Sequence, residues 1–125
     1  MIQAGDRFEW TRTISEEEIR RFAEISGDRG AHHLRPDSQG RLIAHGLLTA
    51  TLPTKLGGDL NFLARTMTFE FLKPVYSGDT LTCNGVVDSA SPEPGKVRMS
   101  FSFEVVNQRR EAVMRGTSSG VVLLR

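Results

Sequence analysis

The spacing of hydrophobic residues divides the chain into a helical N-terminal part and a C-terminal part made of strands. The clearest alternation of hydrophobic with polar residues consists of Val97, Met99, Phe101, Phe103 and Val105. A period of two predicts a strand with one buried face. Similar alternation predicts strands over 67–72, 80–88 and 112–124, separated by segments rich in turn-forming residues. We therefore expect an antiparallel meander of strands in the second half of the chain.

The N-terminal segment predicts a short strand and then a helix with defined ends. Phe8 and Trp10 alternate with polar residues, as in a half-buried strand. Ser15, followed three residues later by Glu18, forms a capping box, which is the signature of a helix N-terminus. Gly27 is placed to end this helix, because glycine adopts the left-handed conformation of a C-terminal cap at little cost.

The most continuously apolar segment, 43–52, predicts a buried helix. Its residues at helical spacing are Leu47, Leu48, Thr51 and Leu52. We expect the helix to span 46–56, with Pro53 and the glycine pair at 57–58 as its breakers. A sheet with one apolar face needs a cover, and this is the only wholly apolar helix that the pattern predicts. The expected fold class is therefore α+β, with the sheet wrapped around this helix.

Composition and charge narrow the classes of function. The 125 residues suffice for one domain, 1–125, with a hydrophobic core. Sixteen basic and 15 acidic residues leave a net charge of +1, which gives no electrostatic reason to expect nucleic acid or a membrane as partner. A single cysteine, Cys83, excludes an internal disulfide, and residues 1–6 have no secretory character. We expect a cytoplasmic protein.

The polar segment 28–41 lies between two helices and lacks periodicity, so we expect a functional loop there. It places Asp28 five residues before His33, a spacing that lets both side chains reach one point. A carboxylate and an imidazole that share one water form a general acid–base pair, because histidine titrates near neutrality. The alternative is structural, since an Asp after a helix often caps a turn and loop histidines are mostly solvated. We expect His32 to point away from His33 and to be exposed.

The start of the buried helix, at His45 and Gly46, is a second candidate feature. The first N–H groups of a helix have no acceptor within it, and Gly46 has no side chain to keep another molecule away. The Gly46 N–H could therefore polarise a carbonyl group while Asp28 and His33 transfer protons. The alternative is a plain core helix with a glycine at a tight entry. His45 fits a hydrogen-bonded core histidine. The three histidines are not accompanied by a further cluster of Cys, Asp or Glu that would complete a metal site, so we expect no metal.

Four stretches of the sequence share one pattern with a known family. They are FAEISGD at 22–28, His33, IAHG at 43–46 and FLKPVYSGDTL at 71–81. Together they resemble the MaoC-like hydratases, which are (R)-specific enoyl-CoA hydratases with the hotdog fold. The stretch at 71–81 is similar to many hotdog proteins, thioesterases included, whereas Ser-Gly-Asp followed by His33 and then by His-Gly is particular to the hydratases. The resemblance extends over about residues 8–124.

This resemblance implies an α+β hotdog fold and a homodimer whose active sites lie between the subunits. It implies a hydro-lyase of fatty acid metabolism that adds water reversibly to a trans-2-enoyl thioester of CoA or acyl carrier protein, without a cofactor. Asp28 and His33 would be the catalytic pair, and the Gly46 N–H would form the oxyanion hole. The expected substrate-binding residues are Thr54, Leu47 and His45.

One departure separates this chain from the family pattern. The family usually has Asn-Pro where Gly30 and Ala31 stand, so we expect a less restrained loop. Asp28 and His33 are both present, which argues against a degenerate subunit that only binds acyl thioesters. Their spacing also argues against the remaining alternative, a hotdog acyl-CoA thioesterase.

Overall fold

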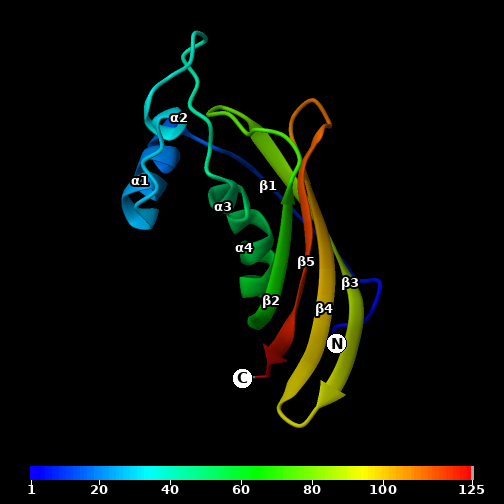
Figure 1. Ribbon diagram of the computed structural model, residues 1–125. Coiled ribbons are helices and arrows are strands. Elements are labelled where there is room, and N and C mark those ends of the chain that lie inside the picture. The colour runs from blue at the N-terminus through cyan, green and yellow to red at the C-terminus, as the bar shows by residue number, and fades with distance from the viewer. Residues whose placement is uncertain (125) are drawn as a thin grey trace.

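The computed structural model describes residues 1–124 (Figure 1). Its elements in chain order are β1 (Arg7–Thr13), α1 (Glu16–Ser26), α2 (Ala31–Leu34), α3 (Gly46–Thr49), α4 (Thr51–Asp59), β2 (Phe62–Phe71), β3 (Thr80–Glu93), β4 (Lys96–Val106) and β5 (Ala112–Leu123). Within these residues no helix has the length and apolar character to cross a bilayer.

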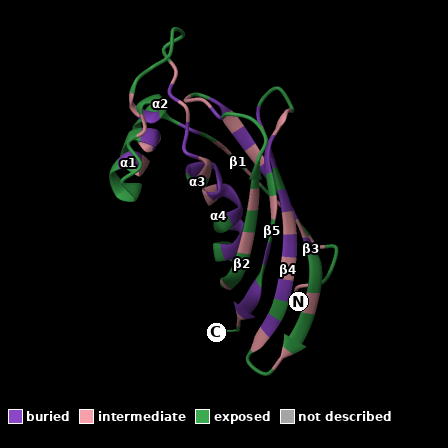
Figure 2. Cartoon of the chain, in the orientation of Figure 1, coloured by how far each residue is buried: buried purple, intermediate pink, exposed green. Residues whose placement is uncertain are grey.

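The strands form one antiparallel sheet in the order β1-β3-β4-β5-β2, so that β1 and β2 are its edges. The sheet curves around α4, which lies along its inner side (Figure 1). Every second residue of β4 faces inward and is at most 4% exposed, and this alternation appears as bands along the strand in Figure 2. Leu52 and Leu56 of α4 belong to the same core. The predicted antiparallel sheet wrapped around a buried helix is confirmed.

The capping box that defines the start of α1 is present in full. The Ser15 hydroxyl accepts from the Glu18 N–H at 3.1 Å, and the Glu18 carboxylate accepts from the Ser15 N–H at 3.0 Å. Ile14 and Ile19 flank this cap and are completely buried, which fixes the angle at which the chain enters the helix. At the other end Gly27 has the left-handed φ of 77° of a C-terminal cap, so Asp28 follows at a defined position.

The breakers predicted for the central helix do not end it. Helical backbone continues to Asp59 and is interrupted only at Ala50, between α3 and α4. Pro53 is the third residue of α4, where its missing N–H removes no hydrogen bond of that helix. The segment 28–41 is also not a continuous loop, because Ala31–Leu34 form one helical turn.

Two strands are longer than the hydrophobic pattern predicts. β2 already begins at Phe62. The pattern missed this start because residues 63–66 are all exposed and show no alternation. β3 continues to Glu93, and its pairing with β4 shifts in register between Val87 and Ser89. This shift exchanges the faces of the strand, and the period of two is lost beyond it.

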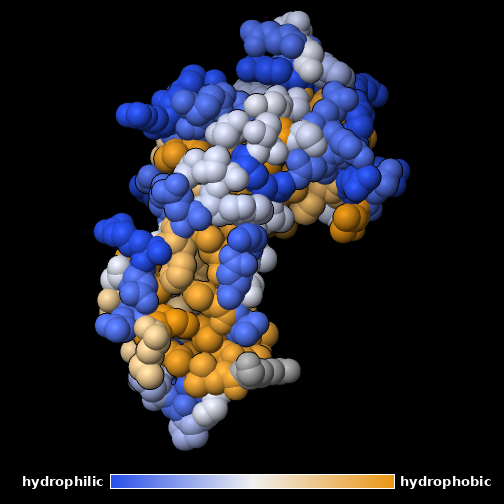
Figure 3. All heavy atoms as spheres, turned by 180° about the vertical axis from the view of Figure 1, so that it is seen from behind, coloured by the Kyte–Doolittle hydropathy of each residue, from blue (hydrophilic) through white to orange (hydrophobic). Residues whose placement is uncertain are grey.

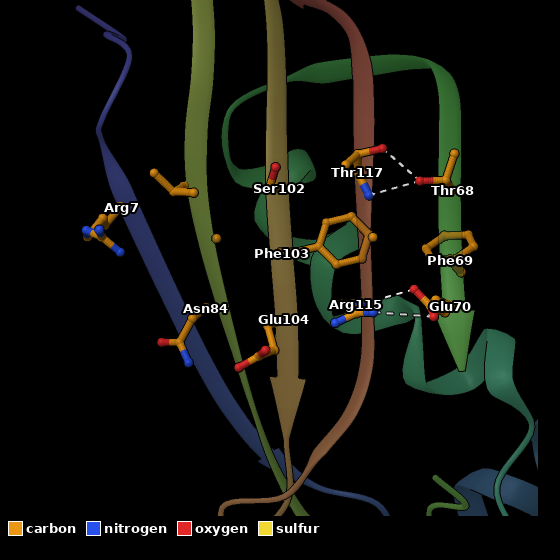
Figure 4. Close-up of a pocket in the computed structure, with 13 residues that line it drawn as sticks. Arg7, Thr68, Phe69, Glu70, Asn84, Ser102, Phe103, Glu104, Arg115 and Thr117 are labelled. Atoms are coloured by element: carbon orange, nitrogen blue, oxygen red, sulfur yellow. Dashed lines mark hydrogen bonds and ion pairs between the residues drawn. The ribbon is translucent and has the colours of Figure 1, made fainter. Parts of the chain in front are cut away.

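The outer face of the sheet is polar and hollow (Figure 4). Arg115 on β5 pairs with Glu70 on β2 at 3.0 Å, and the hydroxyls of Thr68 and Thr117 lie 2.7 Å apart on the same two strands. Both pairs are exposed, so they contribute little to stability. The hollow measures about 830 Å³, and none of the residues predicted for the site lines it.

Candidate active site

A second cavity, of about 510 Å³, lies where α1, the start of α3 and the end of β2 meet. Four of the six residues predicted for the site line it: Asp28, His45, Gly46 and Leu47. Phe22, Phe71 and Lys73 also line it, and no site role was predicted for the two phenylalanines. The smaller cavity, rather than the larger hollow on the outer face, is therefore the candidate site.

Asp28 lines the cavity and faces His33, which is buried and does not itself line the cavity. Asp28 Oδ2 lies 3.4 Å from His33 Nε2. The imidazole is buried, and its other nitrogen, Nδ1, lies 2.7 Å from the Ile43 carbonyl oxygen. A carbonyl oxygen can only accept a hydrogen bond, so Nδ1 carries the proton and donates it. In neutral His33 the lone pair of Nε2 is therefore directed towards the Asp28 carboxylate.

The Asp28 carboxylate is held in its ionised form. The Gly30 N–H donates to Oδ1 at 3.1 Å, and this hydrogen bond is the main reason that the pKa of Asp28 lies below its ordinary value. The nearby imidazoles of His33, His45 and His32 lower that pKa further when they carry charge. The side chain is 57% exposed, so water reaches it freely. Near neutral pH the carboxylate is an acceptor of hydrogen bonds.

His32 does not point away from His33 as predicted. Its ring packs on the His33 ring with the centroids 3.8 Å apart, although the residue is exposed, as expected. Gly30 makes room for it, because a Cβ at position 30 would lie 3.0 Å from His32 Cε1. Both histidines lie in the turn of α2, where neighbouring side chains do not alternate as they would in an extended segment.

His45 is the hydrogen-bonded core histidine that the sequence indicates. It is 3% exposed, and its Nε2 lies 2.9 Å from the Asp28 carbonyl oxygen, to which it donates. Its ring stacks on the His33 ring with centroids 3.6 Å apart and planes 14° from parallel. His45 also lines the cavity, as a predicted substrate-binding residue should.

Asp28, His33 and His45 place potential metal-ligand atoms within 4.8 Å of one another. The lone pairs of imidazole lie in the plane of the ring, and the His33 and His45 planes are stacked nearly parallel. Two such lone pairs cannot both point at one ion. The arrangement therefore fits a metal ion poorly.

Gly46 is the first residue of α3, and its N–H has no acceptor within residues 1–124. The sequence suggested open space beside the Gly46 Cα, but the structure shows that this space is filled. A Cβ at this position would lie 2.6 Å from Cε1 of Phe71, the last residue of β2. Phe71 is 53% exposed, and its ring fills the space that a side chain at position 46 would need. The glycine thus allows the end of β2 to pack against the start of α3.

The two remaining substrate-binding candidates lie in different places. Leu47 lines the cavity and is 58% exposed. Thr54 is exposed on α4 and does not line the cavity, and its hydroxyl donates to the Ala50 carbonyl at 2.9 Å. The ammonium group of Lys73, at the edge of the cavity lining, pairs with the Glu111 carboxylate at 2.7 Å.

Comparisons with known proteins find a matching family and similar solved structures. The profile of a protein family described as the MaoC like domain matches residues 2–107. No match is found among curated proteins. Among solved structures, R-hydratase PhaJ1 from Pseudomonas aeruginosa is 27% identical with a TM-score of 0.83, over 98% of this chain and 82% of that one.

Two further solved structures are similar. The MaoC-like dehydratase from Rhodospirillum rubrum is 25% identical with a TM-score of 0.77, over 99% of this chain and 94% of that one. The (R)-hydratase from A. caviae involved in PHA biosynthesis is 23% identical with a TM-score of 0.84, over 98% and 97% of the two chains, and at this identity it shows the fold alone.

Proposed function

The chain belongs to the MaoC-like domain family and has the predicted hotdog fold, and from this premise we propose that it is a hydro-lyase that adds water reversibly to a trans-2-enoyl thioester. The observation that carries the proposal is the 3.4 Å approach of His33 Nε2 to the Asp28 carboxylate, which lines the same cavity as Gly46. The Gly46 N–H has no acceptor within residues 1–124. The family and the R-hydratase among its structural neighbours support a hydratase or dehydratase.

In the proposed mechanism the catalytic water lies between Asp28 and His33. The Asp28 carboxylate and neutral His33 Nε2 are both acceptors, so they do not bond to each other directly. A water molecule that donates one O–H to each of them satisfies both and keeps a lone pair free. That lone pair attacks C3 of the enoyl group while one of the two residues takes the proton. The residue that holds the proton then returns it to C2 on the same face, which gives syn addition.

The electrons of the C2–C3 double bond move to the thioester oxygen when the new C3–O bond forms. The proposed stabilising donor is the Gly46 N–H, which has no acceptor within residues 1–124 and would donate a hydrogen bond to that oxygen. A preorganised donor of this kind stabilises an enolate-like oxygen because no solvent has to reorganise around it. Protonation at C2 reforms the thioester carbonyl and releases the 3-hydroxyacyl product.

The proposed substrate is a thioester of CoA or of acyl carrier protein, and the proposed product has the (R) configuration at C3. Leu47, His45 and, at a greater distance, Thr54 stay predictions as substrate contacts. Neither a metal nor a redox cofactor takes part in the proposal. A homodimer, a cytoplasmic location and a role in fatty acid metabolism belong to the proposal as well.

The direct test is hydration of crotonyl-CoA and longer enoyl-CoAs. The reaction is measured as the loss of absorbance of the conjugated thioester. We expect turnover by the purified chain alone, with 3-hydroxyacyl-CoA as the product and no free thiol. Release of free CoA would identify a thioesterase instead. No turnover by the chain alone, with turnover restored by a second subunit, would identify the non-catalytic partner.

A further inference from the structure

His45 connects the start of α3 to the segment that carries Asp28 and His33, and we infer that it is a positioning residue for the proposed reaction. This inference rests on the proposed function and adds a residue that orients the reacting groups without exchanging protons itself. His45 is suited to such a role because it lies within the core, at 3% exposure.

The first contact fixes the main chain at Asp28. His45 Nε2 donates to the Asp28 carbonyl oxygen at 2.9 Å, across 17 positions of sequence. The Asp28 side chain is more than half exposed and accepts one hydrogen bond, from Gly30. Without the bond from His45, the peptide to which the carboxylate is attached would lose its link to the core.

The second contact fixes the plane of His33. The Ile43 carbonyl holds one edge of that ring at Nδ1, which still allows the ring to rotate about this hydrogen bond. Stacking of the His45 ring at 3.6 Å and 14° restricts this rotation, in addition to the His32 ring, whose centroid lies 3.8 Å from that of His33. The Nε2 lone pair is then directed at the water site rather than beside it.

The third link is covalent, because the N–H of Gly46 belongs to the peptide that joins His45 to Gly46. One residue thereby sets the positions of the carboxylate, the imidazole and the oxyanion donor relative to one another. His45 Nε2 is engaged in its hydrogen bond, and Nδ1 is shielded from solvent without a partner among residues 1–124. The side chain is therefore placed to orient, and a misplacement of about 1 Å can cost a hundredfold in rate.

Two substitutions separate the contacts of His45. His45→Gln keeps an N–H that can reach the Asp28 carbonyl but loses the stacked ring, whereas His45→Phe keeps the ring and loses the donor. The matched control is Ser118→Ala on β5, which removes another buried hydrogen bond to a backbone carbonyl, that of Thr66 at 3.1 Å. We expect each His45 variant to lower kcat per folded molecule about 10- to 100-fold, with KM changed less than about threefold. Ser118→Ala should lower the Tm and leave kcat unchanged.

A second readout does not depend on turnover. In ¹⁵N-labelled protein, NMR should show His33 protonated at Nδ1 and His45 at Nε2, and the His33 Nδ1–H signal should broaden in His45→Gln but not in Ser118→Ala. If both His45 variants keep the wild-type kcat per folded molecule and an unchanged His33 signal, His45 is a structural residue only. An inactive wild type would overturn the proposed function, while the His33 signal would still decide whether His45 holds the ring.

Discussion

His33 is buried, and its hydrogen bond to the Ile43 carbonyl leaves a single ring nitrogen for chemistry. Its place in a polar segment suggests a residue that can be replaced without effect on the fold, but the structure contradicts this. Removal of the ring would leave the Ile43 carbonyl without a donor, at a cost of about 1–3 kcal/mol. A test of catalysis at this position must therefore preserve that hydrogen bond.

We predict that Asp28→Asn and His33→Asn each lower kcat at least about a hundredfold, which is the usual contribution of a positioned acid or base. Asn at position 33 can still donate to the Ile43 carbonyl, and Asn at position 28 can still accept from Gly30, so both variants should fold. The matched control is Asp37→Asn, because the Asp37 carboxylate also accepts backbone N–H bonds in the segment 28–41. Near-normal hydration of enoyl-CoA by either site variant would show that the pair is not catalytic.

Gly46→Ala should lower both the Tm and kcat, for two different reasons. The new Cβ meets the Phe71 ring at 2.6 Å, which costs stability, and it also crowds the approach of the thioester to the Gly46 N–H. Loss of one oxyanion donor lowers kcat by about 10²–10³. Both quantities should be measured on one preparation.

The double variant Gly46→Ala/Phe71→Leu separates the two effects, with Phe71→Leu as its control. The smaller side chain relieves the contact, so the Tm should recover towards that of Phe71→Leu while kcat stays low. Recovery of kcat together with the Tm would mean that Gly46 serves packing alone.

The sequence could predict that Asp28 and His33 lie close together, because they are only five positions apart. It could not reveal the neighbours of Gly46, since Phe71 is 25 positions away and meets it only after β2 has folded back along the sheet. The link from His45 to Asp28 was hidden for the same reason. Contacts between distant segments depend on topology, and the hydrophobic pattern does not specify them.

At the scale of elements, α2 explains the departure from the family pattern at Gly30 and Ala31. Ala31 is the first residue of this helical turn, and Gly30 before it has φ −52° and ψ 143°. Proline is favoured at the first helical position, and the residue before a proline prefers this extended backbone. The turn therefore forms in this chain without the proline that the family pattern places there.

We predict that Ala31→Pro stabilises the protein by about 0.4–1 kcal/mol, because it restricts the unfolded chain while fitting the folded one. The Ala31 N–H has no acceptor within residues 1–124, so its loss should cost nothing. Thermal unfolding measures the gain, and hydration of enoyl-CoA should remain within about twofold of wild type. Ala90→Pro within β3 is the contrasting control and should destabilise. A lower Tm for Ala31→Pro would contradict this account of α2.

Sequence patterns predicted elements best where their ends carry chemical signals. Ser15, Glu18 and Gly27 fixed both ends of α1, whereas Pro53 was misread because its position within the first turn of α4 depends on the break at Ala50. The start of β2 was missed for a different reason. Residues 63–66 are exposed on both faces, so a pattern based on burial has nothing to detect there.

At the scale of the whole molecule, the edge strand β2 exposes apolar side chains and has no neighbouring strand on one side within the described residues. Leu63 and Phe71 on this strand are 56% and 53% exposed. Figure 3 shows hydrophobic residues gathered at the surface beside the C-terminal end of the chain, and pairing of Phe62 with Val122 places the start of β2 at that end. Unpaired apolar edges are normally covered by another strand or chain.

We predict a homodimer of twice the 13.9 kDa of one chain, formed through β2. Leu63→Glu should shift the mass towards the monomer, because it places a charge on the covered edge. Ile25→Glu is the control, since Ile25 is 83% exposed on α1 and away from that edge. Light scattering at micromolar concentration measures the masses, and a monomeric wild type would contradict the prediction.

The buried thiol of Cys83 provides a chemical probe of whether the sheet is intact. This single thiol is fully buried on β3 between Trp10 of β1 and Val105 of β4, and burial raises its pKa to about 12. Only the thiolate reacts with alkylating reagents, and in an opened chain the pKa returns to about 8.5. The labelling rate at pH 8 should therefore follow the fraction of molecules whose sheet has opened. The alkylation rate of Cys83 therefore measures how often the sheet opens. For every variant it can be measured on the same sample as turnover.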